Sequence, residues 1–398
     1  MFTATPFPLA KVTEGQLQLL GEGLWCWSPE KDCNTLNCSG CEEEGCIPRR
    51  LKRLSCFFGH YKQITSSYEP QVIAGEHGAF KSHDDVVWVI RQLKSQPDIP
   101  RGELVTQIFA STRFSKPPPP SEQQLAINFA VHIMFMVNCT AQRQRFGLLE
   151  HGMQKVEWRD DFTLAQFIGD IFQMTDHPSI NDTDTVISQT MRTSLMARKL
   201  KKVAGLKFRP TDDLRNHLKL DEKTGMVDVF HHTAFLKEHL RLTKNAPADI
   251  SITECLRRGA LPRQLALEAL DSIQKILFPL SDTKSYSLLR SLTSTASFDP
   301  DCLRFESTSV RNPHEKDIQY LYFGSRLADL FEELENPRPR SWVEKFLERK
   351  SRARHVMMTT VIGVAVAIFL GVASLGVGAY QAWVGYQQWR HPISTGSG

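Results

Sequence analysis

The sequence predicts a mainly α-helical fold with one small β-hairpin, arranged as a helical cytosolic body and one C-terminal transmembrane helix. Apolar residues that recur at three- and four-residue spacings, as between Val86 and Leu93, predict the helical body. Two alternating apolar runs on either side of a turn that ends in Gly225 predict the hairpin. A long stretch without charged side chains near the C-terminus predicts the membrane helix.

The composition of the 398-residue chain is that of a globular protein, with 41% hydrophobic and 23% charged residues. The formal net charge of +4 does not predict nucleic-acid binding by the chain as a whole. The first ten residues lack the basic and apolar regions of a secretory signal peptide. The nine cysteines are therefore interpreted as thiols or metal ligands in preference to a disulfide framework.

The predicted transmembrane helix covers residues 356–379, which carry no charged side chain. About 20 apolar residues in a helix cross a hydrocarbon core of about 30 Å. The Val, Ile, Leu and Phe side chains of this segment favour insertion by about 3 to 7 kcal/mol. The lipid bilayer is therefore the first predicted partner of the chain.

The charges beside this helix predict its orientation. The segment before it is basic, and the tail after it contains Arg390. The positive-inside rule places the more basic side, and with it the body, in the cytosol. The short tail makes this a tail-anchored arrangement in the endoplasmic reticulum or another endomembrane, and a cytosolic body leaves its sequons without glycan. The basic residues before the helix are Lys345, Arg349, Lys350, Arg352 and Arg354, and the sequons are at Asn37, Asn138 and Asn181.

A row of small residues follows one face of the membrane helix. Gly363, Ala367 and Gly371 recur at a spacing of four. Small residues at this spacing let two helices approach closely in lipid, so a homodimer through the transmembrane helix is one alternative. The other is that glycine and alanine are simply common in membrane helices.

The organisation of the chain follows from its composition along the sequence. Four consecutive prolines predict a stiff linker at 116–120, since such a run favours an extended backbone. The predicted parts are a Cys-rich irregular N-terminal region (1–83), a short helical segment (84–115), the Pro-rich linker (116–120), a helical cytosolic domain (121–335) with its hairpin at 217–231, a basic juxtamembrane segment (336–355), the transmembrane helix (356–379) and a short tail (380–398).

The N-terminal cysteines are the first candidate metal site. Cys38 and Cys41 have the two-residue spacing that directs two thiolates at one tetrahedral ion. The candidate ligands for a structural zinc ion are Cys33, Cys38, Cys41 and Cys46, and Cys56 or His60 are further choices for completing the set. A second Cys-x-x-Cys motif is absent, so free thiols and disulfides remain as alternatives.

A second group of candidates lies between the hairpin and the helix after it. His231, His232 and His239, with Asp228 and Glu238, contain the residue types of a metal or acid–base site. The alternative is that these side chains form hydrogen bonds within the core. The sequence contains no phosphate loop, dinucleotide fingerprint or nucleophile elbow, which lowers the expectation of an enzyme.

A basic stretch precedes the hairpin, between Arg198 and Arg209. The order of helix, basic stretch, hairpin and helix is loosely that of a winged helix that binds DNA. Anionic lipid headgroups would attract the same side chains, and the membrane anchor favours that interpretation. A solvated helix end is the remaining alternative.

Four segments of the C-terminal half are distinctive: Val229–Leu240, Tyr322–Leu327, Glu332–Pro337 and Arg354–Met358. They resemble segments of a family of uncharacterised single-pass membrane proteins from filamentous fungi. The resemblance implies a fungal membrane protein and carries over no catalytic or binding residue. An accessory role beside a fungal secondary-metabolite gene cluster is compatible with it. The cysteine-rich N-terminal region lies outside the resemblance.

The leading functional hypothesis is a membrane-tethered, non-enzymatic interaction or regulatory protein whose body binds an unidentified protein partner. One alternative is a membrane-anchored enzyme that uses the histidine and acid groups between Asp228 and His239. Another is a tethered nucleic-acid binder that uses the basic stretch, although nucleic acid is not an expected partner of the chain as a whole.

Overall fold

The computed structural model forms two compact units, Met1–Pro337 and Arg338–Gly398, which we describe separately. We call the first unit the body. The structure describes residues 7–28, 46–70, 72, 77–114, 116–139, 157–181, 186–247, 250–295, 298–305, 309–315, 317–338 and 354–390.

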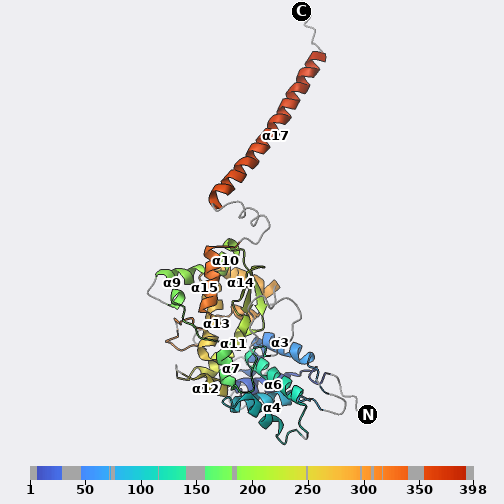
Figure 1. Cartoon of the computed structure of the whole chain (residues 1–398), viewed down its shortest axis with the longest axis vertical. Coiled ribbons are helices and arrows are strands. Elements are labelled where there is room, and N and C mark those ends of the chain that lie inside the picture. The colour runs from blue at the N-terminus through green and yellow to red at the C-terminus, as the bar shows by residue number, and fades with distance from the viewer. Residues whose placement is uncertain are drawn as a thin grey trace, which may run out of the picture. The chain divides into compact units, whose positions relative to one another are not determined.

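The body is mainly helical, with one small sheet among its described residues, which confirms the predicted fold class. In Figure 1, α3, α4 and α6 lie together at one end of the body, whereas α10, α14 and α15 lie at the other. The helices of the first half are α1 (Glu14–Trp25), α2 (Ile47–Arg53), α3 (Ser55–Ser66), α4 (His83–Ser95), α5 (Arg101–Phe109), α6 (Pro120–Phe135), α7 (Leu164–Ile171), α8 (Pro178–Asn181), α9 (Val186–Ser194) and α10 (Ala197–Val203).

The helices of the second half complete the body. A π-helical segment, η4 (Ser272–Leu277), continues α13 directly. The remaining elements are the 3₁₀ segments η3 (Leu214–Asn216) and η5 (Pro300–Leu303) and the helices α11 (Thr233–Thr243), α12 (Ile252–Arg257), α13 (Arg263–Asp271), α14 (Thr283–Thr295) and α15 (Gly324–Glu335).

The sheet has three strands in the order β1–β3–β2. The antiparallel pair of β2 (Leu220–Asp221) and β3 (Met226–Phe230) is the predicted hairpin, and Gly225 in its turn has φ of +70°. The sequence did not predict β1 (Lys207–Thr211), which pairs with β3 in parallel. The predicted hairpin therefore supplies two of the three strands of a mixed sheet.

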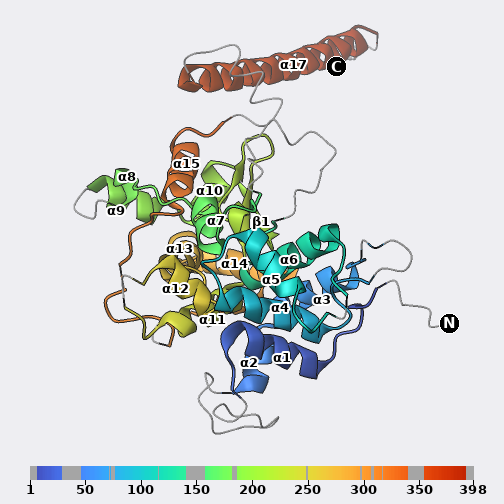
Figure 2. The same ribbon diagram turned by 60° about the horizontal axis from the view of Figure 1, so that its bottom comes forward.

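The N-terminal region was predicted to be irregular, and for its described residues this prediction is wrong. Thr13 begins α1 with a capping box formed with Gln16. Helix α1 packs against both α4 and α2, and Figure 2 shows these helices close together. Trp25 lies 5.3 Å from the ring of Phe57 and 6.1 Å from that of Phe235, measured between centroids. The N-terminal helices thus belong to the same core as α11.

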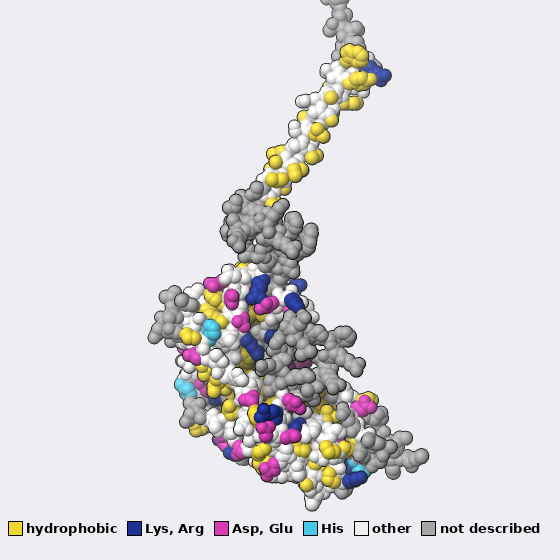
Figure 3. Space-filling model, viewed as in Figure 1, with side chains coloured by type: hydrophobic (Ala, Val, Ile, Leu, Met, Phe, Trp, Pro, Cys, Tyr) yellow, Lys and Arg dark blue, Asp and Glu magenta, His cyan; other side chains and the backbone are white. Residues whose placement is uncertain are grey.

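The second unit contains α17 (Arg354–Arg390), which begins near the predicted transmembrane segment and continues past its predicted end. The 30 residues Val361–Arg390 form one helix that is long and apolar enough to cross a membrane. Its described side chains are almost all exposed, and Figure 3 shows hydrophobic side chains along the length of the helix. The aromatic residues Tyr380 and Trp389 also fall within this helix.

Candidate functional site

Two parallel strands end side by side and bring polar side chains together. Thr211, the last residue of β1, pairs with Phe230, the last residue of β3. Asp212 therefore follows one strand at the point where His231 and His232 follow the other. The Oδ1 atom of Asp212 lies 2.7 Å from Nε2 of His232 and 3.3 Å from Nε2 of His231. The sheet is the reason that these three side chains meet.

Helices α3 and α6 add side chains to the same place. Nδ1 of His60 lies 3.4 Å from Oδ2 of Asp212, and its Nε2 lies 3.2 Å from Nε2 of His132 in α6. Cys56 precedes His60 by four residues and so lies on the same face of α3. Its Sγ atom lies 3.8 Å from Nδ1 of His231. The His–Asp cluster, as we call it, consists of Cys56, His60, His132, Asp212, His231 and His232.

The hydrogen bonds of the cluster define where the protons lie. The backbone N–H of Asp299 donates to Nδ1 of His231 over 2.9 Å. The neutral imidazole of His231 therefore carries its proton on Nε2 and donates it to Asp212. His232 also contacts Asp212 through Nε2, and its buried Nδ1 has no hydrogen-bond partner among the described residues. Asp212 thus accepts from both imidazoles.

The environment shifts the ionisation of the cluster. Burial alone would raise the pKa of Asp212, but hydrogen bonds from His231, His232 and His60 bring it well below its usual range. Burial lowers the pKa of His232 to about 3 and also lowers that of His132. At neutral pH, Asp212 is therefore a carboxylate, and the imidazole rings of His132 and His232 are neutral.

Cys56, His231 and Asp212 lie in the order of a nucleophile, a base and an orienting carboxylate. A nucleophilic cysteine needs a thiolate, which usually follows from a lowered thiol pKa. Here burial, followed by the charges of Asp299 and Asp212, raises the pKa of Cys56 to about 12. The nitrogen of His231 that faces the thiol is also bound by the Asp299 N–H. The arrangement therefore does not favour nucleophilic catalysis.

The structure divides the histidine group that the sequence singled out. His231 and His232 are neighbours, with ring centroids 4.2 Å apart. His239 is buried elsewhere, where its Nδ1 accepts the N–H of Leu261 and its ring packs against Phe235. The two predicted acids also lie outside the cluster, and each pairs with arginine instead. Asp228 pairs with Arg209, and Glu238 pairs with Arg50 and Arg241.

The predicted cysteine site is only partly within the described residues. Cys33, Cys38 and Cys41 lie outside them. Cys46 is buried and precedes α2 as its N-terminal cap residue. Zinc binding by these four cysteines stays a prediction. Cys56 and His60, which the sequence offered as further ligands for that site, belong to the His–Asp cluster.

The basic stretch is partly neutralised in the folded body. Arg198 pairs with Asp282 over 3.2 Å, and Arg209 pairs with Asp228 over 2.7 Å. Lys201 and Lys202 are exposed on α10. The remaining positive charge is therefore smaller than the sequence suggests, which reduces the case for a nucleic-acid interface.

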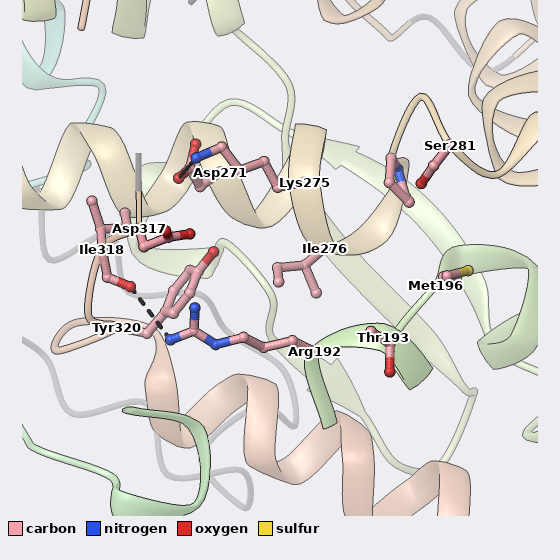
Figure 4. Close-up of a pocket in the computed structure, with 11 residues that line it drawn as sticks. Arg192, Thr193, Met196, Asp271, Lys275, Ile276, Ser281, Asp317, Ile318 and Tyr320 are labelled. Atoms are coloured by element: carbon pink, nitrogen blue, oxygen red, sulfur yellow. Dashed lines mark hydrogen bonds and ion pairs between the residues drawn. The ribbon is translucent and has the colours of Figure 1, made fainter. Parts of the chain in front are cut away.

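A half-open cavity of about 240 Å³ lies between α9, η4 and the segment before α15. Three of its charged side chains, Arg192, Asp271 and Lys275, contact neighbouring groups, as Figure 4 shows for Arg192 and the carbonyl oxygen of Ile318. Arg192 also lies over the ring of Tyr320, and Lys275 pairs with Asp271 over 2.9 Å. The cavity is smaller than most ligand pockets. It is therefore a less informative site than the His–Asp cluster.

Comparison with known proteins adds no assignment, because no protein-family model, curated protein or solved structure matches the chain. Sequence reasoning missed Asp212, His60 and His132 as members of one cluster. The only local signal was the i, i+4 spacing of Cys56 and His60.

Proposed function

We propose that this protein is a single-pass membrane protein that α17 anchors in the endoplasmic reticulum or another endomembrane, with its body in the cytosol. The proposal rests on the apolar helix Val361–Arg390. None of the residues in its most apolar part is buried against the rest of the chain. Leaving one large apolar side chain in water instead of burying it costs about 1.5 to 3 kcal/mol. A lipid environment removes that cost for the whole helix.

The orientation in this proposal rests on charge. Lys345, Arg349 and Lys350 are among the basic residues before the helix, and Arg390 follows its apolar part. Basic residues beside a membrane helix remain on the cytosolic side. We call the chain without substitutions the parent chain. An N-glycan on Asn37 or Asn138 of the parent chain in microsomes would place the body in the lumen and contradict this orientation.

Anchoring is tested by placing two charges in the helix. Arginine at the centre of a membrane helix costs about 2.5 to 3.5 kcal/mol, so Val366→Arg with Leu370→Arg cancels most or all of the insertion energy. We expect alkaline carbonate to leave the parent chain in the membrane pellet and to release the double variant. A parent chain found in the supernatant, or a double variant that stays in the pellet, would contradict anchoring by α17.

The control makes the same two residue changes on the body. Val203 and Leu280 are 56% and 59% exposed, close to the 52% and 60% of Val366 and Leu370. The Val203→Arg, Leu280→Arg variant adds the same charge and is expected to stay in the pellet. Any release caused by charge alone would then be visible in the control.

Within this proposal, the body acts as an interaction or regulatory protein that binds another protein at the membrane. The absence of familiar catalytic motifs in the sequence supports a non-enzymatic role. Affinity purification of the parent chain from solubilised membranes tests it, with the charged α17 variant for comparison. A protein partner recovered only with the anchored chain supports the proposal, and recovery of no partner with either chain contradicts it.

The second candidate function is a membrane-anchored enzyme, which the His–Asp cluster favours. Asp212 accepts hydrogen bonds from two imidazoles, and such a combination is common at sites of acid–base or metal chemistry. Its side chain is 48% exposed, so the cluster is open to solvent on that side. Asp212→Asn tests this candidate, since loss of an activity with retained partner binding would distinguish the two functions.

A further inference from the structure

The strongest unassigned feature of the body is a group of metal-ligating atoms within the His–Asp cluster. The Sγ atom of Cys56 and one ring nitrogen each of His231 and His232 lie within 4.8 Å of one another. Sγ is 3.8 Å from Nδ1 of His231. A tetrahedral zinc ion with Zn–S of about 2.3 Å and Zn–N of about 2.1 Å holds its ligand atoms about 3.6 Å apart. The distances between these side-chain atoms are thus already close to those between the ligand atoms of a zinc ion.

A carboxylate accepts hydrogen bonds from the two imidazoles on the side opposite the proposed ligand atoms. Asp212 lies within 3.3 Å of Nε2 of both His231 and His232. Histidines that bind metal usually donate their other ring N–H to a carboxylate, which fixes the tautomer and leaves the second nitrogen as the ligand atom. Here that second nitrogen is Nδ1 in both residues. The carboxylate of Asp212 therefore fixes the tautomer of both imidazoles and leaves Nδ1 of each as a possible ligand atom.

His232 provides an independent indication. Its side chain is 1% exposed, and its Nδ1 atom has no hydrogen-bond partner among the described residues. A buried nitrogen lone pair without a partner is unfavourable, since water would have bonded to it in the unfolded chain. A bound cation would satisfy this lone pair.

We propose that Cys56, His231 and His232 bind a divalent zinc-class cation through Sγ and the two Nδ1 atoms. Asp212 is the positioning residue, and a water molecule fills the fourth coordination position, as in zinc sites with three protein ligands. Mixed sulfur and nitrogen ligands select zinc over magnesium or calcium. Binding converts the thiol of Cys56 to a thiolate, and the proton leaves to solvent.

Binding has one structural consequence that can be measured. The N–H of Asp299 now donates to Nδ1 of His231 over 2.9 Å, and the ion takes that lone pair. The Asp299 N–H must therefore give up this bond. A single hydrogen bond is small compared with three bonds to a metal ion. Hydrogen exchange at the Asp299 amide should accordingly become faster when the ion binds.

The experiment is a Co²⁺ titration of the full chain in detergent, because a cobalt–thiolate pair gives a charge-transfer absorption band. The N-terminal cysteines would give the same band, so Cys33, Cys38, Cys41 and Cys46 are first replaced by serine. We expect this background to bind one cobalt ion per chain and to show the band. A background that binds no cobalt, or shows no thiolate band, overturns the proposal.

Three further variants in the same background locate the site. Cys56→Ser is expected to abolish the band, and Asp212→Asn is expected to keep it while weakening binding by about 10- to 100-fold. Cys255→Ser, which replaces a buried thiol of α12, is the matched control and is expected to keep both band and affinity. A band that survives Cys56→Ser overturns the proposal.

Hydrogen exchange of the parent chain gives a readout that does not depend on any substitution. Faster exchange at Asp299 with Zn²⁺ than with Mg²⁺ is the expected result. Identical exchange with the two ions contradicts binding at His231 Nδ1. Neither measurement depends on whether α17 spans a membrane, so failure of this inference leaves the proposed anchoring intact.

Discussion

Removal of the Lys237 ammonium group is expected to destabilise the body strongly. Lys237 is fully buried and lies 2.6 Å from Oδ2 of Asp301, which is itself almost completely buried. Removing one partner of a buried ion pair costs about 3 to 5 kcal/mol, because the other charge stays in a low-dielectric environment. Domains are stable by about 5 to 15 kcal/mol. The substitution Lys237→Met therefore removes a large share of the stability.

The structure narrows the expected loss to the lower end of this range. Without Lys237, Asp301 keeps a hydrogen bond from the Thr233 hydroxyl over 3.0 Å and a contact with Arg53 over 3.4 Å. Both offset part of the cost of the buried carboxylate, so we expect a loss of about 3 kcal/mol. Urea unfolding of the full chain in detergent, followed by tryptophan fluorescence, measures the free energy of unfolding.

Lys275→Met is the matched control. Lys275 pairs with the buried Asp271 over 2.9 Å, but its side chain is 44% exposed, and Asp271 also pairs with Arg311. An exposed pair contributes about 0 to 1 kcal/mol. Equal losses in Lys237→Met and Lys275→Met would refute the burial argument.

A double variant tests the same reasoning from the other side. Adding Asp301→Asn to Lys237→Met removes the buried carboxylate that has lost its ammonium partner but keeps an oxygen that accepts from Thr233. The double variant should therefore be more stable than Lys237→Met alone. A further loss of stability on adding Asp301→Asn would show that the buried carboxylate is not the source of the cost.

Two further predictions concern pH and backbone conformation. Burial lowers the pKa of His217 to about 3 from 6.5, so between these values the unfolded chain binds a proton that the folded chain does not. The contribution of neutral His217 to the free energy of unfolding is complete above pH 6.5, and it decreases by about 2 kcal/mol from pH 7 to pH 5. His217→Asn should therefore reduce the loss of stability measured by urea unfolding at these two pH values, and an unchanged loss would contradict this assignment. Gly259→Ala should destabilise more than Gly205→Ala in the same assay. Both glycines have positive φ, but a Cβ at 259 would lie 2.5 Å from Cε of Lys94, whereas none of the atoms considered lies within 4 Å at 205. Equal losses would indicate that backbone strain alone matters.

The elements that the sequence predicted correctly are those with local patterns. The apolar spacing between Val86 and Leu93 in α4 and the alternating residues of the hairpin can be recognised without tertiary information. Helix α1 was missed because its glycines lower helix propensity. The structure shows why Gly21 and Gly23 are tolerated: a Cβ would lie within 2.4 Å of the Trp27 ring and 2.7 Å from Cγ1 of Val87. Close packing outweighs local propensity in this helix.

Strand β1 shows the same limit at the candidate site. Its sequence is short, contains Pro210 and places basic residues at alternate positions. Proline is tolerated because β1 is an edge strand of the sheet. Without β1, the sequence could not place Asp212 next to His231, and the contact between Cys56 and His231 joins residues 175 positions apart. The cluster depends on strand pairing and helix packing that local patterns do not encode.

The stability of the body and the geometry of the cluster depend on the same segment, η5. The ion pair between Lys237 and Asp301 fixes the start of η5, and Asp299, its N-terminal cap residue, donates to His231 from there. This hydrogen bond uses the lone pair of His231 Nδ1, which is one of the three proposed ligand atoms. A cation must therefore compete with η5 for one nitrogen. The ion pair keeps η5 attached to α11 during this exchange, because Lys237 lies on α11 and the pair does not involve the imidazole. Anchoring η5 through Asp301 allows Asp299 to yield one hydrogen bond while the segment remains attached to the core.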